Sequence, residues 1–226
     1  MHIASIDIES TSDPSVESFL PAIEPHKGRK PGSESYNQWI IDKENERREK
    51  MPLTPSQNLI VCIGIVDNSG REKAFSIPKH TDDQAVLLEM EKNALIKFWE
   101  YLSEMQYGIF VTCNGLNFDI PTLNLHSVRH NIPVSVRIDT AKYRQGNHLD
   151  IYGVLNNHQR LSGGLDYLAQ YFGLPGKQGM SGKMVPQMFR DGRIDEIAEY
   201  CLSDCKQTLA IGQKIIECNL WGRYYE

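Results

Sequence analysis

Four carboxylates and one tyrosine stand at positions where an apolar pattern would otherwise continue. Asp7 and Glu9 are two residues apart in an extended segment, so both point to the same side of a strand. Asp204 falls within the apolar stripe of the helical segment 194–216, and Tyr200 lies one turn before it on the same stripe. Adjacent like charges are tolerated best when a cation lies between them, and carboxylate oxygens are the ligands that Mg²⁺ and Mn²⁺ prefer. The pattern therefore indicates a divalent-cation site.

Asp119 is the fourth carboxylate, and it ends the stretch Asn114-Gly-Leu-Asn-Phe-Asp119 after a strand. Ligand sites of open α/β sheets form beyond strand ends, where such turns lie. Each carboxylate also has a simpler interpretation. Asp7 and Glu9 could face solvent on an edge strand, Asp119 could complement a helix dipole, and Asp204 could pair with a lysine or arginine. Taken one at a time, the residues leave both interpretations open.

Alternating strands and helices must position these side chains. The turn Asn68-Ser69-Gly70 joins two β-rich segments into a predicted hairpin, which makes the sheet mixed. We therefore predict an α/β fold, with a central mixed β-sheet flanked by helices. The expected strands span 3–8, 59–67, 72–77 and 108–113, and the expected helices span 36–50, 83–104 (capped by Asp82 or Asp83), 118–129, 150–156, 163–172 and 194–216.

Composition bounds the class of protein. The chain has 226 residues, 40% of them hydrophobic, so a single domain with one core is expected over 1–226. Residues 12–57, with six prolines, are predicted to be an insertion. The longest apolar run has eight residues and no signal peptide is visible, which predicts a cytoplasmic protein with no membrane segment. The net charge of −5 disfavours a nucleic-acid partner, although two divalent cations would offset most of it.

The carboxylate motifs together resemble those of a known family. Asp7-x-Glu9, Asn114-Gly-x-x-Phe-Asp119 and Tyr200-x-x-x-Asp204 are similar to the three motifs of DEDD 3′–5′ exonucleases, which have a ribonuclease H-like fold. The closest resemblance is to the proofreading exonuclease domain of family B DNA polymerases and its stand-alone relatives. His148-Leu-Asp150 and the loop Gly173-Leu-Pro-Gly-Lys177 resemble the same branch. Tyrosine four residues before the last aspartate matches the DEDDy subtype, since the DEDDh subtype has histidine where Glu199 stands.

The resemblance implies a two-metal mechanism that uses Mg²⁺ or Mn²⁺. Asp7 would bridge both ions, with Glu9 and Asp204 completing the site that binds the attacking water. Asp119 would hold the second ion, and Tyr200 would orient the water. Nucleoside 5′-monophosphates would be released from a 3′ end, with single-stranded DNA as the favoured partner, RNA as another, and replication or repair proteins as further partners.

Substrate contacts are predicted near these motifs. A basic cluster at 26–30 could touch phosphate or lie in an exposed loop, and Phe118 could stack on a base or lie in the core. Two other functions remain open, a catalytically silent nucleic-acid-binding or polymerase-accessory module and a ribonuclease H-like nuclease that cuts internally. The predicted substrate-binding residues are Ser10, Asn114, Phe118, Lys177 and Lys183.

Overall fold

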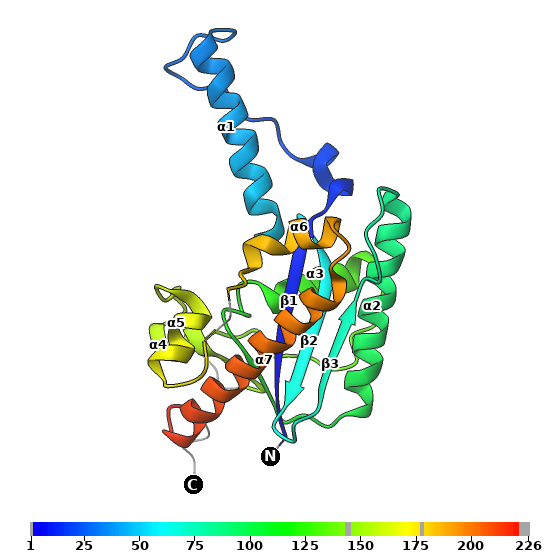
Figure 1. Ribbon diagram of the computed structural model, residues 1–226, viewed down its shortest axis with the longest axis vertical. Helices are drawn as coiled ribbons and strands as arrows, with labels where there is room; N and C mark the ends of the chain where they lie inside the picture. The colour runs from blue at the N-terminus through cyan, green and yellow to red at the C-terminus, as the bar shows by residue number, and fades with distance from the viewer. Residues whose placement is uncertain (1, 143–145, 177–178, 222–226) are drawn as a thin grey trace.

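A five-stranded mixed sheet forms the centre of the molecule, in the order β3-β2-β1-β4-β5 (Figure 1). The computed structural model describes residues 2–142, 146–176 and 179–221. β1 is antiparallel to β2 and parallel to β4, β2 is antiparallel to β3, and β4 is parallel to β5. The predicted α/β class is therefore confirmed. The strands are β1 (Ile3–Ser12), β2 (Asn58–Asp67), β3 (Glu72–Ser76), β4 (Ile109–Thr112) and β5 (His148–Asp150).

Helices cover both faces of the sheet. The long α7 (Ile194–Glu217) crosses one face, where it contacts β1, β2, β3 and β4 (Figure 1). α2 (Gln84–Glu104) and α3 (Asp119–Arg129) pack on the other face. The remaining helices are α1 (Glu34–Lys50), α4 (Ile151–Asn156), α5 (Gly164–Tyr171) and α6 (Val185–Arg190), with 3₁₀ turns η1 (Pro14–Phe19), η2 (Met51–Leu53) and η3 (Gly182–Met184).

The alternation predicted for the first strand is confirmed. Ala4, Ile6 and Ile8 join the core formed with α2 and α3. On the opposite face Ser5 donates its hydroxyl to the carbonyl oxygen of Cys205, at 2.7 Å. This buried hydrogen bond attaches α7 to β1 one residue beyond Asp204, on the side of the strand that also carries Asp7 and Glu9.

Two glycines bring α7 unusually close to the sheet. A Cβ on Gly64 of β2 would lie 2.7 Å from Cys201 Sγ, and one on Gly212 of α7 would lie 2.5 Å from Val111 Cγ1. Side chains at either position would push the helix away. The missing Cβ atoms therefore let α7 present its buried residues directly to β1.

The segment 12–57 leaves the sheet and carries α1, which projects from the body of the molecule (Figure 1). No residue of α1 is buried. The helix predicted at 36–50 is confirmed and starts earlier, at Glu34, because the Ser33 side chain accepts a hydrogen bond from the backbone N–H of Tyr36. An ion pair between Arg129 and Asp13, together with the buried Met51, anchors the base of this segment.

Two elements were not predicted from the sequence, the short strand β5 and the helix α6. β5 has only three residues, and its pairing with β4 follows from tertiary contacts rather than from an alternating pattern. α6 has Pro186 in its first turn, where the missing N–H costs nothing. The helix was not predicted because a proline in the sequence usually indicates a loop. Among the helices that the structure describes, none is long and apolar enough to cross a membrane.

Candidate active site

The candidate site lies where β1 runs beyond its parallel neighbour. The pairing of β1 with β4 covers Ile3 to Ser5, and β4 ends at Thr112. The turn that follows β4 and the first turn of α3 then approach the free side of β1. Asp119, the first residue of α3, lies near the backbone of Ile8, which acts to lower the pKa of its carboxyl group. The strand ends thus create the gap into which Asp119 reaches.

The opposite wall of the site comes from α7. Cys201 Sγ lies 3.4 Å from the carbonyl oxygen of Asp7 and 3.7 Å from its Oδ2. Potential ligand atoms of Asp7, Glu9 and Cys201 all lie within 4.8 Å of one another. Tyr200 and Asp204 flank this cysteine on the buried face of the same helix. Side chains that are nearly 200 residues apart in the chain therefore meet at one place.

Electrostatics shows how closely the acidic groups are packed. Burial raises the pKa of Asp119 well above its usual value, and the charges of Asp7 and Asp150 raise it further. Burial likewise raises the pKa of Tyr200, with added contributions from Asp204, Glu9 and Asp7. Asp119 and Tyr200 resist carrying a negative charge first because they are buried and then because carboxylates lie nearby.

The cluster fits a hard divalent cation. Asp119 Oδ1 is buried and accepts no hydrogen bond from the described residues, which leaves a carboxylate oxygen facing the acidic cluster. A cation there would remove both the repulsion and the desolvation cost. Burial also raises the pKa of the Cys201 thiol, which disfavours the thiolate, so the carboxylates of Asp7, Glu9, Asp119 and Asp204 are the candidate ligands for such a cation.

Asp150 holds the turn that precedes Asp119. Its Oδ1 accepts from the backbone N–H groups of Asn114, Tyr152 and Gly153, at 3.2, 2.9 and 3.2 Å. Its Oδ2 accepts from the N–H of Leu116, at 2.8 Å. The same carboxylate thus caps α4 and positions the turn. Sequence reasoning gave Asp150 no role of its own, although an aspartate immediately before an apolar helix is a typical N-cap.

Three of the predicted substrate-binding residues, Ser10, Asn114 and Phe118, make different contacts in the structure. The Ser10 hydroxyl donates to the carbonyl oxygen of Pro52, at 2.6 Å, just after a bulge that re-aims β1. Asn114 has a left-handed backbone with φ 71°, and its side-chain oxygen accepts from Asn117. Phe118 is half-buried and packs against the core under α2 and α3. Substrate contact by each of them remains a prediction.

The glycine-rich segment before α6 approaches Glu9. A Cβ on Gly182 would lie 3.9 Å from Glu9 Oε2, and the next residue, Lys183, is exposed. Lys183 therefore stands at the rim of the acidic cluster. Lys177 lies outside the described residues, so its predicted role has no structural counterpart here.

A comparison with known protein families identifies the family of the chain. Residues 52–216 match the model of a family described as a predicted 3′–5′ exonuclease related to the exonuclease domain of PolB. The matched segment contains Asp119, Tyr200 and Asp204, whereas Asp7 and Glu9 precede it.

Two similar proteins are DNA polymerases. The DNA polymerase of Orgyia pseudotsugata multicapsid polyhedrosis virus is 24% identical over 195 residues, which cover 71% of this chain and 20% of that protein. The structure of the family B DNA polymerase from the archaeon Pyrobaculum calidifontis superposes with a TM-score of 0.61 at 17% identity. The match covers 97% of this chain and 25% of that one, so the chain spans a fifth to a quarter of these proteins.

Proposed function

The chain belongs to the family of predicted 3′–5′ exonucleases related to the exonuclease domain of PolB, and we propose that it hydrolyses phosphodiester bonds stepwise from the 3′ end of a nucleic acid. The observation that carries the proposal is the acidic cluster around Asp119, whose buried Oδ1 has no hydrogen-bond donor among the described residues. Such a cluster suits cation-dependent phosphoryl chemistry. Without a cation it would only destabilise the folded protein.

The carboxylates of Asp7, Glu9, Asp119 and Asp204 would hold two Mg²⁺ or Mn²⁺ ions. When bound, these ions supply an activated water, neutralise the charge that develops on the phosphate, and assist departure of the 3′ oxygen. The protein contributes fixed ligand positions. Ser5 attaches α7 to β1, and Asp150 holds the turn before Asp119.

Tyr200 would orient the attacking water as a hydrogen-bond donor. Its pKa is raised by burial and by the nearby carboxylates, so the phenol stays protonated at neutral pH and cannot serve as the base. This behaviour supports assignment of the chain to the DEDDy subtype, in which the final motif carries tyrosine rather than histidine.

DNA is the favoured substrate, because both similar proteins are named as DNA polymerases. A single-stranded 3′ end would pass over the rim where Lys183 is exposed and can meet a phosphate. A role beside replication or repair proteins is proposed on the same ground.

The decisive experiment incubates 5′-labelled single-stranded DNA and RNA of the same sequence with the protein in Mg²⁺, Mn²⁺ or EDTA. We expect a descending ladder from the 3′ end that is lost in EDTA and in Asp7→Ala. A circular single-stranded DNA serves as the control, because an exonuclease leaves it intact whereas an internally cutting nuclease opens it. A folded protein that binds the DNA and yields no ladder would identify a silent binding module instead.

Substitution of Tyr200 by phenylalanine separates water orientation from cation binding. Loss of one hydrogen bond to a reacting or charged group costs about 1.5–3 kcal/mol, which corresponds to a rate lower by about 10- to 100-fold. Calorimetric titration with Mn²⁺ should give unchanged stoichiometry, since the four carboxylates remain. An equal loss of cation binding would show that Tyr200 acts on the ligands rather than on the water.

A further inference from the structure

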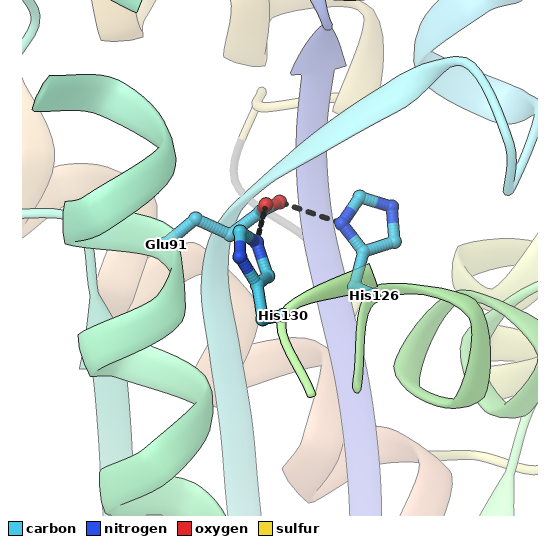
Figure 2. A group of neighbouring side chains, drawn as sticks. All are labelled: Glu91, His126 and His130. Carbon is cyan, nitrogen blue, oxygen red and sulfur yellow. Dashed lines mark hydrogen bonds and ion pairs between the residues drawn. The ribbon is translucent and has the colours of Figure 1, made fainter. Parts of the chain in front are cut away.

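A second group of potential ligands lies on the opposite face of the sheet from α7. Glu91 of α2 faces His126 and His130 of α3, and Figure 2 shows both rings turned toward its carboxylate. His126 Nδ1 lies 2.8 Å from Glu91 Oε1, and His130 Nε2 lies 2.7 Å from Oε2. The side chains are 0% exposed for Glu91, 4% for His126 and 9% for His130. None of them contributes to the acidic cluster at Asp7.

The protonation of His126 can be read from its neighbours. Its Nε2 lies 3.0 Å from Asn58 Oδ1 and 3.2 Å from the carbonyl oxygen of Pro55, and both atoms are acceptors. The Asn58 amide is oriented by its Nδ2, which donates to the carbonyl oxygen of Pro52. Nε2 must therefore carry a hydrogen, which leaves the other ring nitrogen, Nδ1, as the atom that faces the carboxylate.

Nδ1 does not form a directed hydrogen bond with that carboxylate. Although Glu91 Oε1 is only 2.8 Å away, a hydrogen on Nδ1 would not point at it, and no other described acceptor replaces it. Oε1 already accepts the backbone N–H of Ile60, at 2.7 Å. Because this contact is short yet not aligned as a hydrogen bond, Nδ1 and the carboxylate can both be ligands of one cation that lies to one side of the line joining them.

We propose that Glu91, His126 and His130 bind one Zn²⁺ ion, at a site separate from the proposed exonuclease centre. Two histidines at i and i+4 present their nitrogens on one face of a helix, a spacing typical of zinc sites. Imidazole nitrogen with one carboxylate oxygen suits Zn²⁺ better than Mg²⁺. His130 is the most accessible ligand, so water can enter from its side and complete a tetrahedral set.

The ion would have a structural role in positioning the active-site helix. α3 begins with Asp119, and His126 follows seven residues later, about two turns or 10 Å along the axis. Zn²⁺ bound from α2 would clamp α3 against its neighbour, and the Asn58 contact connects the same clamp to the start of β2. The proposal does not require that the chain be a nuclease.

The test measures zinc content in the Asp7→Asn background, because Asp7, Glu9 and Cys201 also lie within ligand distance of one another. After loading with ZnCl₂ and dialysis, we expect one equivalent of zinc by mass spectrometry and a higher Tm than in the zinc-free protein. With Co²⁺, the visible spectrum should show tetrahedral nitrogen and oxygen ligation without a thiolate charge-transfer band. Such a band would assign the ion to Cys201 and overturn the proposal.

Variants at the cluster provide the second measurement. His130→Gln should lose the retained zinc and its Tm increment, whereas the exposed His2→Gln serves as the matched control and should keep both. Asn58→Ala removes one of the two acceptors that orient His126 and should weaken zinc binding about 10- to 100-fold. If Asp7→Asn retains no zinc, or if His130→Gln retains as much as the control, the cluster is an ion-pair network and the proposal fails. These readouts are independent of nuclease activity, so they distinguish failure of this proposal from failure of the proposed function.

Discussion

Two buried aspartates in this molecule have opposite electrostatic surroundings. Asp119 of the candidate site is 3% exposed and Asp67 at the hairpin is 2% exposed. Burial raises the pKa of both carboxyl groups. At Asp67, hydrogen bonds from the hydroxyl and N–H of Ser69 and from Arg71 more than reverse this effect, and its pKa is about 2. At Asp119 the neighbouring charges of Asp7 and Asp150 add to it.

The difference separates stability from function. An ionised Asp67 is held by donors at 2.6 to 2.9 Å and therefore stabilises the turn between β2 and β3. An ionised Asp119 destabilises the folded protein unless a cation offsets the repulsion. Two aspartates of similar burial thus have opposite effects on the stability of the folded protein. The destabilising one, Asp119, is the one proposed to bind metal.

The largest expected effect comes from Asp119→Asn. As a proposed ligand, Asp119 would contribute several kcal/mol of charge stabilisation, so its loss should lower nuclease activity by about 10²- to 10³-fold. In EDTA the same change should raise the Tm at neutral pH, because it removes a buried carboxyl group that is costly to ionise without changing the shape of the side chain. Labelled-DNA cleavage and thermal unfolding monitored by circular dichroism measure the two effects.

The pH dependence of the stability of the metal-free protein tests whether Asp119 is destabilising at neutral pH. Because the folded pKa of Asp119 is raised, the folded state binds more protons than the unfolded state at neutral pH, and this group's contribution to stability increases as pH falls. The stabilisation by Asp119→Asn in EDTA should therefore shrink toward pH 5. If Asp119→Asn instead lowered the Tm as much as Asp67→Asn does, the contrast between the two aspartates would be wrong.

Asp150→Ala should have an intermediate effect. Four backbone N–H groups lose their acceptor, which costs about 2 kcal/mol or more in the free energy of unfolding, and the turn before Asp119 shifts. We expect activity to fall about tenfold, since misplaced groups lose rate steeply. Urea unfolding and steady-state cleavage report the two changes.

Asp83 provides the matched control for that variant. It also caps a helix and accepts two backbone N–H groups, those of Ala85 and Val86, but at the exposed start of α2. Asp83→Ala should cost about 1 kcal/mol and leave cleavage unchanged. Equal loss of activity in both variants would show that general destabilisation, not the position of the turn, is responsible.

Asp67→Asn should change stability alone. Since the folded pKa of about 2 lies below the ordinary value of 3.8 for an aspartate, the ionised group contributes about 2 kcal/mol above pH 4. This contribution is lost as pH falls through about 2, so unfolding curves of the wild type and the variant should converge there. Activity at pH 7 should match the wild type, and a variant whose deficit persisted at pH 2 would contradict the electrostatic explanation.

Periodicity and residue type predicted most of the scaffold. The two-residue period of β1 set Asp7 and Glu9 on the face opposite Ala4 and Ile6, and the helical period set Asp204 among apolar neighbours. These rules are local, so they hold before any tertiary contact forms. The strand β5 and the role of Asp150 escaped prediction, because both depend on residues 34 to 38 positions earlier in the chain.

The amino-acid sequence by itself determined which residues could do chemistry, in what order they occur, and which face of its own element each one occupies. Only the tertiary structure decided which of these faces meet. The glycines that let α7 approach the sheet, the gap beside β1 beyond β4, and the convergence of Glu91 with His126 and His130 all arise from contacts between distant segments. Such contacts leave no periodic pattern, because each depends on the position of a partner that no local rule specifies.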